Sequence, residues 1–204
     1  QKETYVYIIK QTVSFLKREL SNQQGAYYAA LDADSEGVEG KFYTWSYDEI
    51  EQLLDPSLFT EFCNYYQVTK NGNWEHTNIV WTTGLIEDAW KEELVEAKKI
   101  LIIHRAKRIR PSTDNKILLS WNCLMIIALC KAYAINADIS IIERAEKNMH
   151  WLCNHMQSKE GFLFHSYTNG QPKSMGFLED YATLIQALIE LHKATGNTAH
   201  LLEA

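Results

Sequence analysis

Hydrophobic residues recur at three- and four-residue spacing along most of the chain, with polar residues between them. The first such run, Tyr5 to Leu20, places its apolar positions on one face and predicts an amphipathic helix. Ser46, followed by two acids, begins a second helix that stops or restarts at Pro56. Further helices are expected at about 57–66, 85–109, 118–134, 140–157 and 178–194. The pattern therefore predicts a chain built from helical hairpins.

The connections between these helices carry short extended pieces. Residues 21–46 combine glycines, acids and aromatic residues, which is typical of a structured loop. An extended piece is expected at 78–82 and a hairpin at 161–175. The helical stretch 124–129 is similar to 183–188, so the repeating unit is a helix, a loop with a short β-piece, and a helix. Such units build either an α-solenoid or a closed α/α toroid.

Composition and charge narrow the class of protein. Only 9 glycines and 3 prolines occur in 204 residues, which favours helices over many short strands. The balance of 46% hydrophobic and 23% charged residues is that of one globular domain. A net charge of −6 opposes binding to nucleic acid, because phosphate binding needs a basic face. We expect a soluble, cytoplasmic protein with no membrane partner, because no apolar stretch approaches the ~20 residues of a spanning helix.

The four cysteines and seven histidines give no metal or redox motif. The cysteines contain no C-x-x-C pair, so we expect reduced thiols in the core. The histidines form no H-E-x-x-H pattern, and we expect no metal. We expect no cofactor either, since no glycine-rich phosphate loop is present. His165, on the expected hairpin, is the histidine to consider as a base, although a lone surface or core histidine is the more common case.

Four carboxylates lie within eight residues in the loop 32–40. Asp32, Asp34 and Glu36 fit the first positions of an EF-hand calcium loop, but Tyr43 stands where the bidentate acid belongs. Calcium binding is therefore disfavoured. A carboxylate pair can supply a general acid and a general base when one group keeps its proton. The alternative is a solvated loop.

Two further segments contain candidate binding residues. Trp121 and Asn122 combine a flat apolar face with an amide, which is how sugar rings are commonly held. The alternative is a buried tryptophan with a capping amide. Glu179 and Asp180 begin the last expected helix, where acids also favour the positive end of the helix dipole. The basic residues that end the helix 85–109 are interpreted as complements to its negative end: Arg105, Lys107, Arg108 and Arg110.

Three phrases resemble the thioredoxin-domain-containing, spermatogenesis-associated protein family. They are 25–45 (GAYYAALDADSEGVEGKFYTW), 114–122 (DNKILLSWN) and 176–182 (GFLEDYA), in that order. Cys123 and His76 depart from the family pattern. The resemblance implies an all-α fold, a partial (α/α)6 toroid of helical hairpins with short β-hairpins in the loops. This toroid is similar to N-acylglucosamine 2-epimerases and six-hairpin glycosidases.

The resemblance also implies a domain organisation and a set of candidate residues. Residues 1–204 would be a single domain, a fragment of a toroid whose parent chain also carries a thioredoxin-like domain as a partner. The candidate catalytic residues are Asp32, Asp34 and Asp180. The candidate substrate-binding residues are Asp114, Lys116, Trp121, Asn122, Glu179 and Tyr181.

Two functions from different classes follow. The first is binding of a small-molecule carbohydrate or polyol, with activity as a sugar isomerase or epimerase or as a glycoside hydrolase. The second is a noncatalytic helical interaction domain that serves the thioredoxin-like module. Catalysis requires the three candidate segments to converge in one aromatic-lined pocket, whereas an interaction domain tolerates their dispersal.

Overall fold

The computed structural model describes residues 2–84 and 86–204. It divides the chain into two compact units. The first unit contains the chain up to Leu31 together with Thr113–Ala204, and the second contains Asp32–Ser112. Each unit has its own hydrophobic core.

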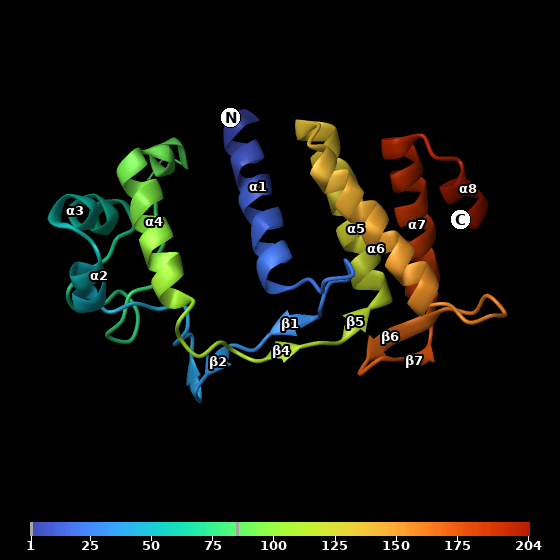
Figure 1. The fold of residues 1–204 in the computed structure, drawn as a ribbon, viewed down its shortest axis with the longest axis horizontal. Helices are drawn as coiled ribbons and strands as arrows, with labels where there is room; N and C mark the ends of the chain where they lie inside the picture. Colours follow the sequence, from blue (N-terminus) through green and yellow to red (C-terminus); the bar gives the residue numbers. More distant parts are fainter. Residues whose placement is uncertain (1, 85) are drawn as a thin grey trace. The chain divides into compact units, whose positions relative to one another are not determined.

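The first unit is built on three long helices that pack together, α5, α6 and α7 (Figure 1). The turn from α5 to α6 is short because Ala137 adopts a left-handed conformation (φ 53°) and Asp138 caps α6 by accepting a hydrogen bond from the Ser140 amide. The helices of this unit are α1 (Lys2–Glu19), α5 (Leu119–Asn136), α6 (Ile139–His155), α7 (Leu178–Thr195) and α8 (Ala199–Glu203).

Helix α5 is the centre of this core. It contributes buried residues on several sides, including Ile126 and Leu129, which is why its sequence is apolar all round. By length and composition α5 is the one described helix that would suffice to cross a membrane, but half of it is buried inside the structure, as in the core helix of a globular protein. Burial raises the pKa of the α5 thiols, to about 12 for Cys123 and about 11 for Cys130.

Short strands join the helices of the first unit. The sheet β5–β6–β7 is antiparallel, and it places Leu118 opposite Ser166 and Phe164 opposite Met175. A separate antiparallel pair, β1 with β4, places Leu31 opposite Thr113. The strands are β1 (Ala30–Leu31), β4 (Thr113–Asp114), β5 (Ile117–Leu118), β6 (Phe164–Thr168) and β7 (Gln171–Met175).

The second unit is smaller, and its core is formed mainly by helices α3 and α4 with Trp45. Ser46 caps its first helix, as the sequence predicts, and Asp55 caps its second, with Pro56 at the first helical position. The elements are β2 (Asp34–Ser35), β3 (Val38–Glu39), α2 (Tyr47–Leu53), α3 (Pro56–Tyr65), the 3₁₀ helix η1 (Ile86–Trp90) and α4 (Glu92–Arg105).

The helical class with short β-hairpins is confirmed, and so is the hairpin at 161–175. The predicted single helix 85–109 is wrong. Its first residue lies outside the described part of the chain, a 3₁₀ turn follows, and α4 begins only at Glu92 because the Lys91 backbone is extended (ψ 137°). It ends at Arg105, several residues before Pro111. Closure into a toroid and the single-domain organisation stay predictions.

Candidate functional site

The first unit holds a buried carboxylate against a histidine. Asp180 is 0% exposed, and its Oδ2 atom lies 2.9 Å from Nδ1 of His165. The same oxygen accepts a hydrogen bond from the Phe177 amide at 2.9 Å, and Oδ1 accepts one from the Ser120 amide at 3.2 Å. A carboxylate that accepts from Nδ1–H leaves Nε2 of the ring as the basic nitrogen. Asp180 therefore fixes both the orientation and the tautomer of His165.

Local sequence explains this arrangement. Asp180 lies three residues after Phe177, the N-cap of α7, so its carboxylate reaches back to the N-cap amide as in a capping box. His165 comes from β6, and the chain returns to it after β7 through Gly176. A Cβ atom at Gly176 would lie 3.1 Å from the Leu163 carbonyl oxygen, so glycine permits the close approach of hairpin and helix.

An aromatic ring and a second carboxylate surround the pair. The Phe177 ring meets the His165 ring edge-on, with centroids 4.8 Å apart, and Phe177 is exposed. Glu179 is exposed as well, and His165, Glu179 and Asp180 bring one ligand atom each within 4.8 Å of one another. The Asp180 oxygens already accept from two amides and His165. We therefore describe a hydrogen-bonded pair with a free carboxylate beside it, rather than a preformed metal centre.

A mostly apolar cavity of about 400 Å³ lies in the first unit, and neither His165 nor Asp180 lines it. Trp121, 56% exposed, lines it and directly follows Ser120, whose amide anchors Asp180. Leu118 also lines the cavity and pairs with Ser166, the residue after His165. The other lining residues are Leu16, Leu20, Tyr27, Tyr28, Ala29, Asn122, Leu124, Met125 and Ala128.

Asn122 holds the backbone of the first unit together. Its Oδ1 atom accepts from the Tyr27 amide at 2.8 Å and from Nδ2 of Asn148 at 2.9 Å. Its Nδ2 atom donates to the carbonyls of Tyr27 and Leu118. All of its usual hydrogen-bonding capacity is thus taken by protein groups, and its substrate-binding role stays a prediction.

The acidic pair of the second unit is exposed. Oδ1 of Asp32 accepts from the Asp34 amide at 3.1 Å, and Oδ2 accepts from the Ser112 hydroxyl at 3.0 Å. The hydrogen bond from the Asp34 backbone, followed by the bond from Ser112, lowers the pKa of Asp32. A lowered pKa suits an ionised carboxylate and opposes the role of proton donor near neutral pH.

The remaining predicted residues belong to the first unit. Asp114 accepts from the side chain of Lys116, at 3.0 Å, and from its amide; these contacts lower the pKa of Asp114. The Tyr181 hydroxyl accepts from the Leu163 amide at 3.1 Å and so ties α7 to the hairpin. The structure thus brings Glu179, Asp180 and Tyr181 to one end of α7, and convergence of these residues with Asp32 and Asp34 stays a prediction.

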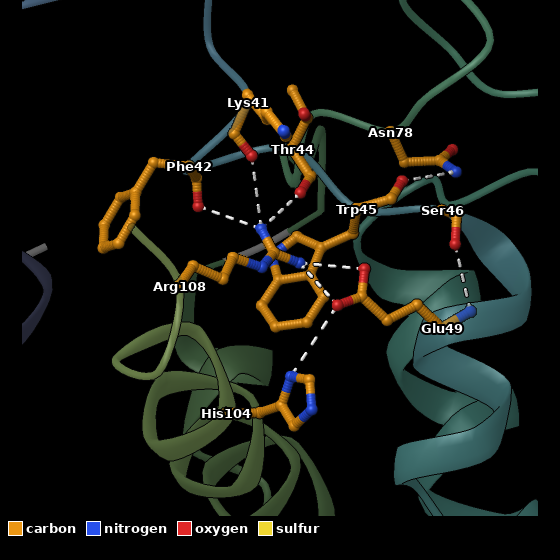
Figure 2. A network of polar contacts seen from close by, with 9 residues as sticks. All are labelled: Lys41, Phe42, Thr44, Trp45, Ser46, Glu49, Asn78, His104 and Arg108. Carbon is orange, nitrogen blue, oxygen red and sulfur yellow. Dashed lines mark hydrogen bonds and ion pairs between the residues drawn. The ribbon is translucent and has the colours of Figure 1, made fainter. Parts of the chain in front are cut away.

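In the second unit, Arg108 makes a polar network instead of capping α4 (Figure 2). Its guanidinium lies 4.0 Å from the Trp45 ring centroid and donates two 2.8 Å bonds to the Glu49 carboxylate. It also donates to the Phe42 and Thr44 carbonyls, at 2.9 and 2.7 Å. Because these groups engage both terminal nitrogens of the guanidinium, we assign Arg108 a structural role.

Sequence reasoning missed Phe177 and the pairing of His165 with Asp180. Phe177 could have been found from the sequence, because it is an aromatic residue near the two acids that begin the last helix. No signal was available for the pairing of His165 with Asp180, because strand register decides which residue of the hairpin faces the helix start.

No protein-family model matches the chain. An uncharacterised protein of Caenorhabditis elegans is 28% identical over 97% of this chain and 32% of its own length. Spermatogenesis-associated protein 20 of Homo sapiens is 27% identical over 98% of this chain and 31% of its own length. The chain thus spans about a third of the length of these curated relatives.

Two solved structures are similar over 97% of this chain. The structure of cellobiose 2-epimerase from Bacillus thermoamylovorans has a TM-score of 0.41 and 11% identity, over 53% of that protein's chain. A sugar epimerase from a ruminal bacterium has a TM-score of 0.41 and 13% identity, over 52% of its chain.

Proposed function

We propose that the first unit binds a carbohydrate or related polyol beside His165 and that His165 moves a proton in an isomerisation or epimerisation. The observation that carries this proposal is the buried Asp180 carboxylate, 2.9 Å from Nδ1 of His165. A histidine oriented by a buried carboxylate is a suitable general base. Trp121 and Phe177 are exposed aromatic faces on which a sugar ring can stack.

The proposed step is proton abstraction next to a carbonyl. Nε2 of His165 accepts the proton from the carbon beside the carbonyl of an open-chain sugar, and the electron pair moves to give an enediolate. Return of that proton to the former carbonyl carbon, with transfer of the hydroxyl proton from the adjacent oxygen to the former carbonyl oxygen, gives the isomer. Protonation of the original carbon on its opposite face gives the epimer and needs a second, proton-bearing group. The Asp180 carboxylate stabilises the imidazolium that forms.

Glycoside hydrolysis is the less favoured reaction. It needs one carboxylic acid whose raised pKa keeps a proton for the leaving group. The hydrogen bonds at Asp32 lower its pKa instead, and Asp180 is buried with both oxygens engaged.

The test is solvent exchange in heavy water, followed by proton NMR on a panel of reducing sugars. We expect deuterium to enter the carbon next to the carbonyl of at least one sugar. His165→Gln should abolish this exchange, and Asp180→Asn should slow it by about a hundredfold, at the lower end of general acid–base effects. His150→Gln, which changes an exposed histidine on α6, should leave the rate unchanged.

Exchange that persists in a folded His165→Gln protein would exclude His165 as the base. Exchange with none of the sugars would reject the isomerase and epimerase reactions. A thermal-shift assay on the same panel of sugars measures binding separately from catalysis. A sugar that stabilises the protein but undergoes no exchange would indicate a carbohydrate-binding function without this activity.

The second candidate is the noncatalytic interaction domain, with a thioredoxin-like domain as the proposed partner. Exposed apolar side chains around the hairpin favour it, because such patches mark interaction surfaces. Leu178 is 85% exposed and Phe162, Met175 and Phe177 are each about half exposed. Leu178→Asp should abolish partner binding while leaving sugar exchange intact if this surface serves a partner only.

A further inference from the structure

A second concavity of the first unit is polar and basic. It has a volume of about 480 Å³ and lies between the end of α1, the following loop and the first half of α6. Apart from Tyr27 and Asn122, no residue that lines the apolar cavity has a role in the argument for it. Its lining residues are Lys17, Ser21, Asn22, Gln23, Gly25, Ser140, Glu143, Arg144 and Lys147.

The pocket is positively charged, although the whole chain is negatively charged. The chain carries a net charge of −6, yet three cations and one carboxylate line the pocket. Among residues 2–84 and 86–204, no carboxylate forms a recorded ion pair with Lys17, Arg144 or Lys147. Unpaired cations that share a concave surface raise its positive potential and favour an anionic ligand.

The fold holds Lys147 in place. Its Nζ donates to the Gln23 carbonyl at 2.8 Å, and its aliphatic stem lies over Gly25. A Cβ atom at Gly25 would lie 2.8 Å from Cγ of Lys147, and Gly25 has a φ of +101°. Glycine is therefore needed here both for the backbone conformation and for the space that the lysine stem occupies.

The buried side chain of Tyr27 lies beside Arg144. Tyr27 is 4% exposed, and both its amide and its carbonyl are hydrogen-bonded to Asn122. Its buried hydroxyl lies beside Arg144, whose side chain is its hydrogen-bonding neighbour. Burial raises the pKa of Tyr27, and the Arg144 charge partly opposes this rise. Tyr27 therefore supports the Arg144 side chain at the wall of the pocket.

We propose that this basic pocket binds a phosphate-bearing small molecule. Arg144 would form a bidentate contact with two phosphate oxygens, which its planar fork allows. Lys17 and Lys147 would neutralise the remaining charge. Glu143 opposes the anion, so its removal strengthens binding.

Inorganic phosphate is the first probe, titrated into the purified protein and followed by NMR chemical shifts and calorimetry. We expect saturable binding that weakens with added salt, because the contacts are between exposed charges. Arg144→Gln should weaken binding about tenfold, or about 1.4 kcal/mol. Glu143→Gln should tighten it about threefold, since it removes a nearby like charge. Lys159→Gln removes an exposed cation outside the pocket and should change nothing.

Absence of saturable phosphate binding would overturn the proposal, and so would an equal loss in Lys159→Gln, which would show a general charge effect. Acetate that binds as tightly as phosphate would exclude specificity for phosphate. If Arg144→Gln does not fold, Arg144→Lys keeps the charge, loses the bidentate contact and should still weaken binding. Glucose 6-phosphate compared with glucose then tests whether a phosphorylated sugar is held.

Discussion

Buried polar side chains set the geometry of the first unit residue by residue. Asn122 and Asn148 join the loop before Tyr27 to helices α5 and α6, and Asp180 joins β6, α5 and α7. Such groups are costly to bury without partners, so their hydrogen bonds specify which backbone segments meet. The candidate site therefore depends on residues that never touch a ligand.

Asn122→Ala should reveal this dependence. The change leaves the Tyr27 amide and carbonyl without their partner, and the free energy of unfolding should fall by about 2–4 kcal/mol. Urea denaturation measures the loss. Asn154→Ala removes an exposed amide that donates hydrogen bonds to His150 of the same helix and should cost less than about 0.5 kcal/mol. Equal losses for the two variants would contradict the scaffold role of Asn122.

Asp138 provides a pH-dependent contribution at the start of α6. Hydrogen bonds from the Ser140 side chain and then the Ser140 amide lower the pKa of Asp138 below its usual 3.8. A lowered folded-state pKa stabilises the protein above the unfolded-state pKa, and this stabilisation disappears as the pH falls through the folded-state value. The stability difference between the protein and Asp138→Asn should therefore be constant near neutral pH and shrink below about pH 3.8.

Thermal unfolding between pH 2 and pH 7 measures this difference. Ser140→Ala removes the largest cause of the lowered pKa and serves as the matched variant, because it should reduce the pH dependence while leaving the carboxylate in place. A difference that grows on acidification would contradict the assignment.

At the scale of elements, the end of α4 is tied to the loop before α2 by one side chain. Arg108 follows α4 and contacts carbonyls of the loop together with Glu49 of α2. Arg108→Lys keeps the charge but loses the planar fork and the stacking on Trp45. The free energy of unfolding should fall by about 2 kcal/mol, because hydrogen bonds to charged groups are among the stronger ones.

Chemical denaturation monitored by tryptophan fluorescence follows this change, since Trp45 lies under the guanidinium. Lys107→Gln, at the neighbouring exposed position, is the control and should stay within about 0.5 kcal/mol of the parent. An Arg108→Lys protein as stable as the parent would show that the network of Figure 2 contributes nothing measurable to stability.

The elements were predictable from the sequence wherever periodicity and capping agreed. The spans of α5, α6 and α7 follow from their apolar positions, and Asp55 with Pro56 marks the start of α3. The start of α4 was not predictable, because its N-cap, Lys91, makes no side-chain cap. The pairing of His165 with Asp180 depends on register between β6 and α7, which a local pattern does not contain.

At the scale of the whole molecule, the two cores do not share a buried residue. Every buried residue of one core lies before Leu31 or after Thr113, and every buried residue of the other lies between Asp32 and Ser112. The chain leaves the first unit at β1 and re-enters it at β4, and these strands are paired with Leu31 opposite Thr113. The second unit is thus an insertion between two neighbouring ends.

Excision of 32–112, with Leu31 and Thr113 joined by Asn-Gly, should leave the first unit folded. Residues paired across antiparallel strands lie about 5 Å apart, and two-residue turns of this type close such hairpins. We expect one cooperative thermal transition, retained near-UV circular dichroism and phosphate binding like that of the uncut protein. The same excision combined with Asn122→Ala is the control, which should lose the native signal. A molten product from the excision alone would show that the first unit needs the inserted segment in order to fold.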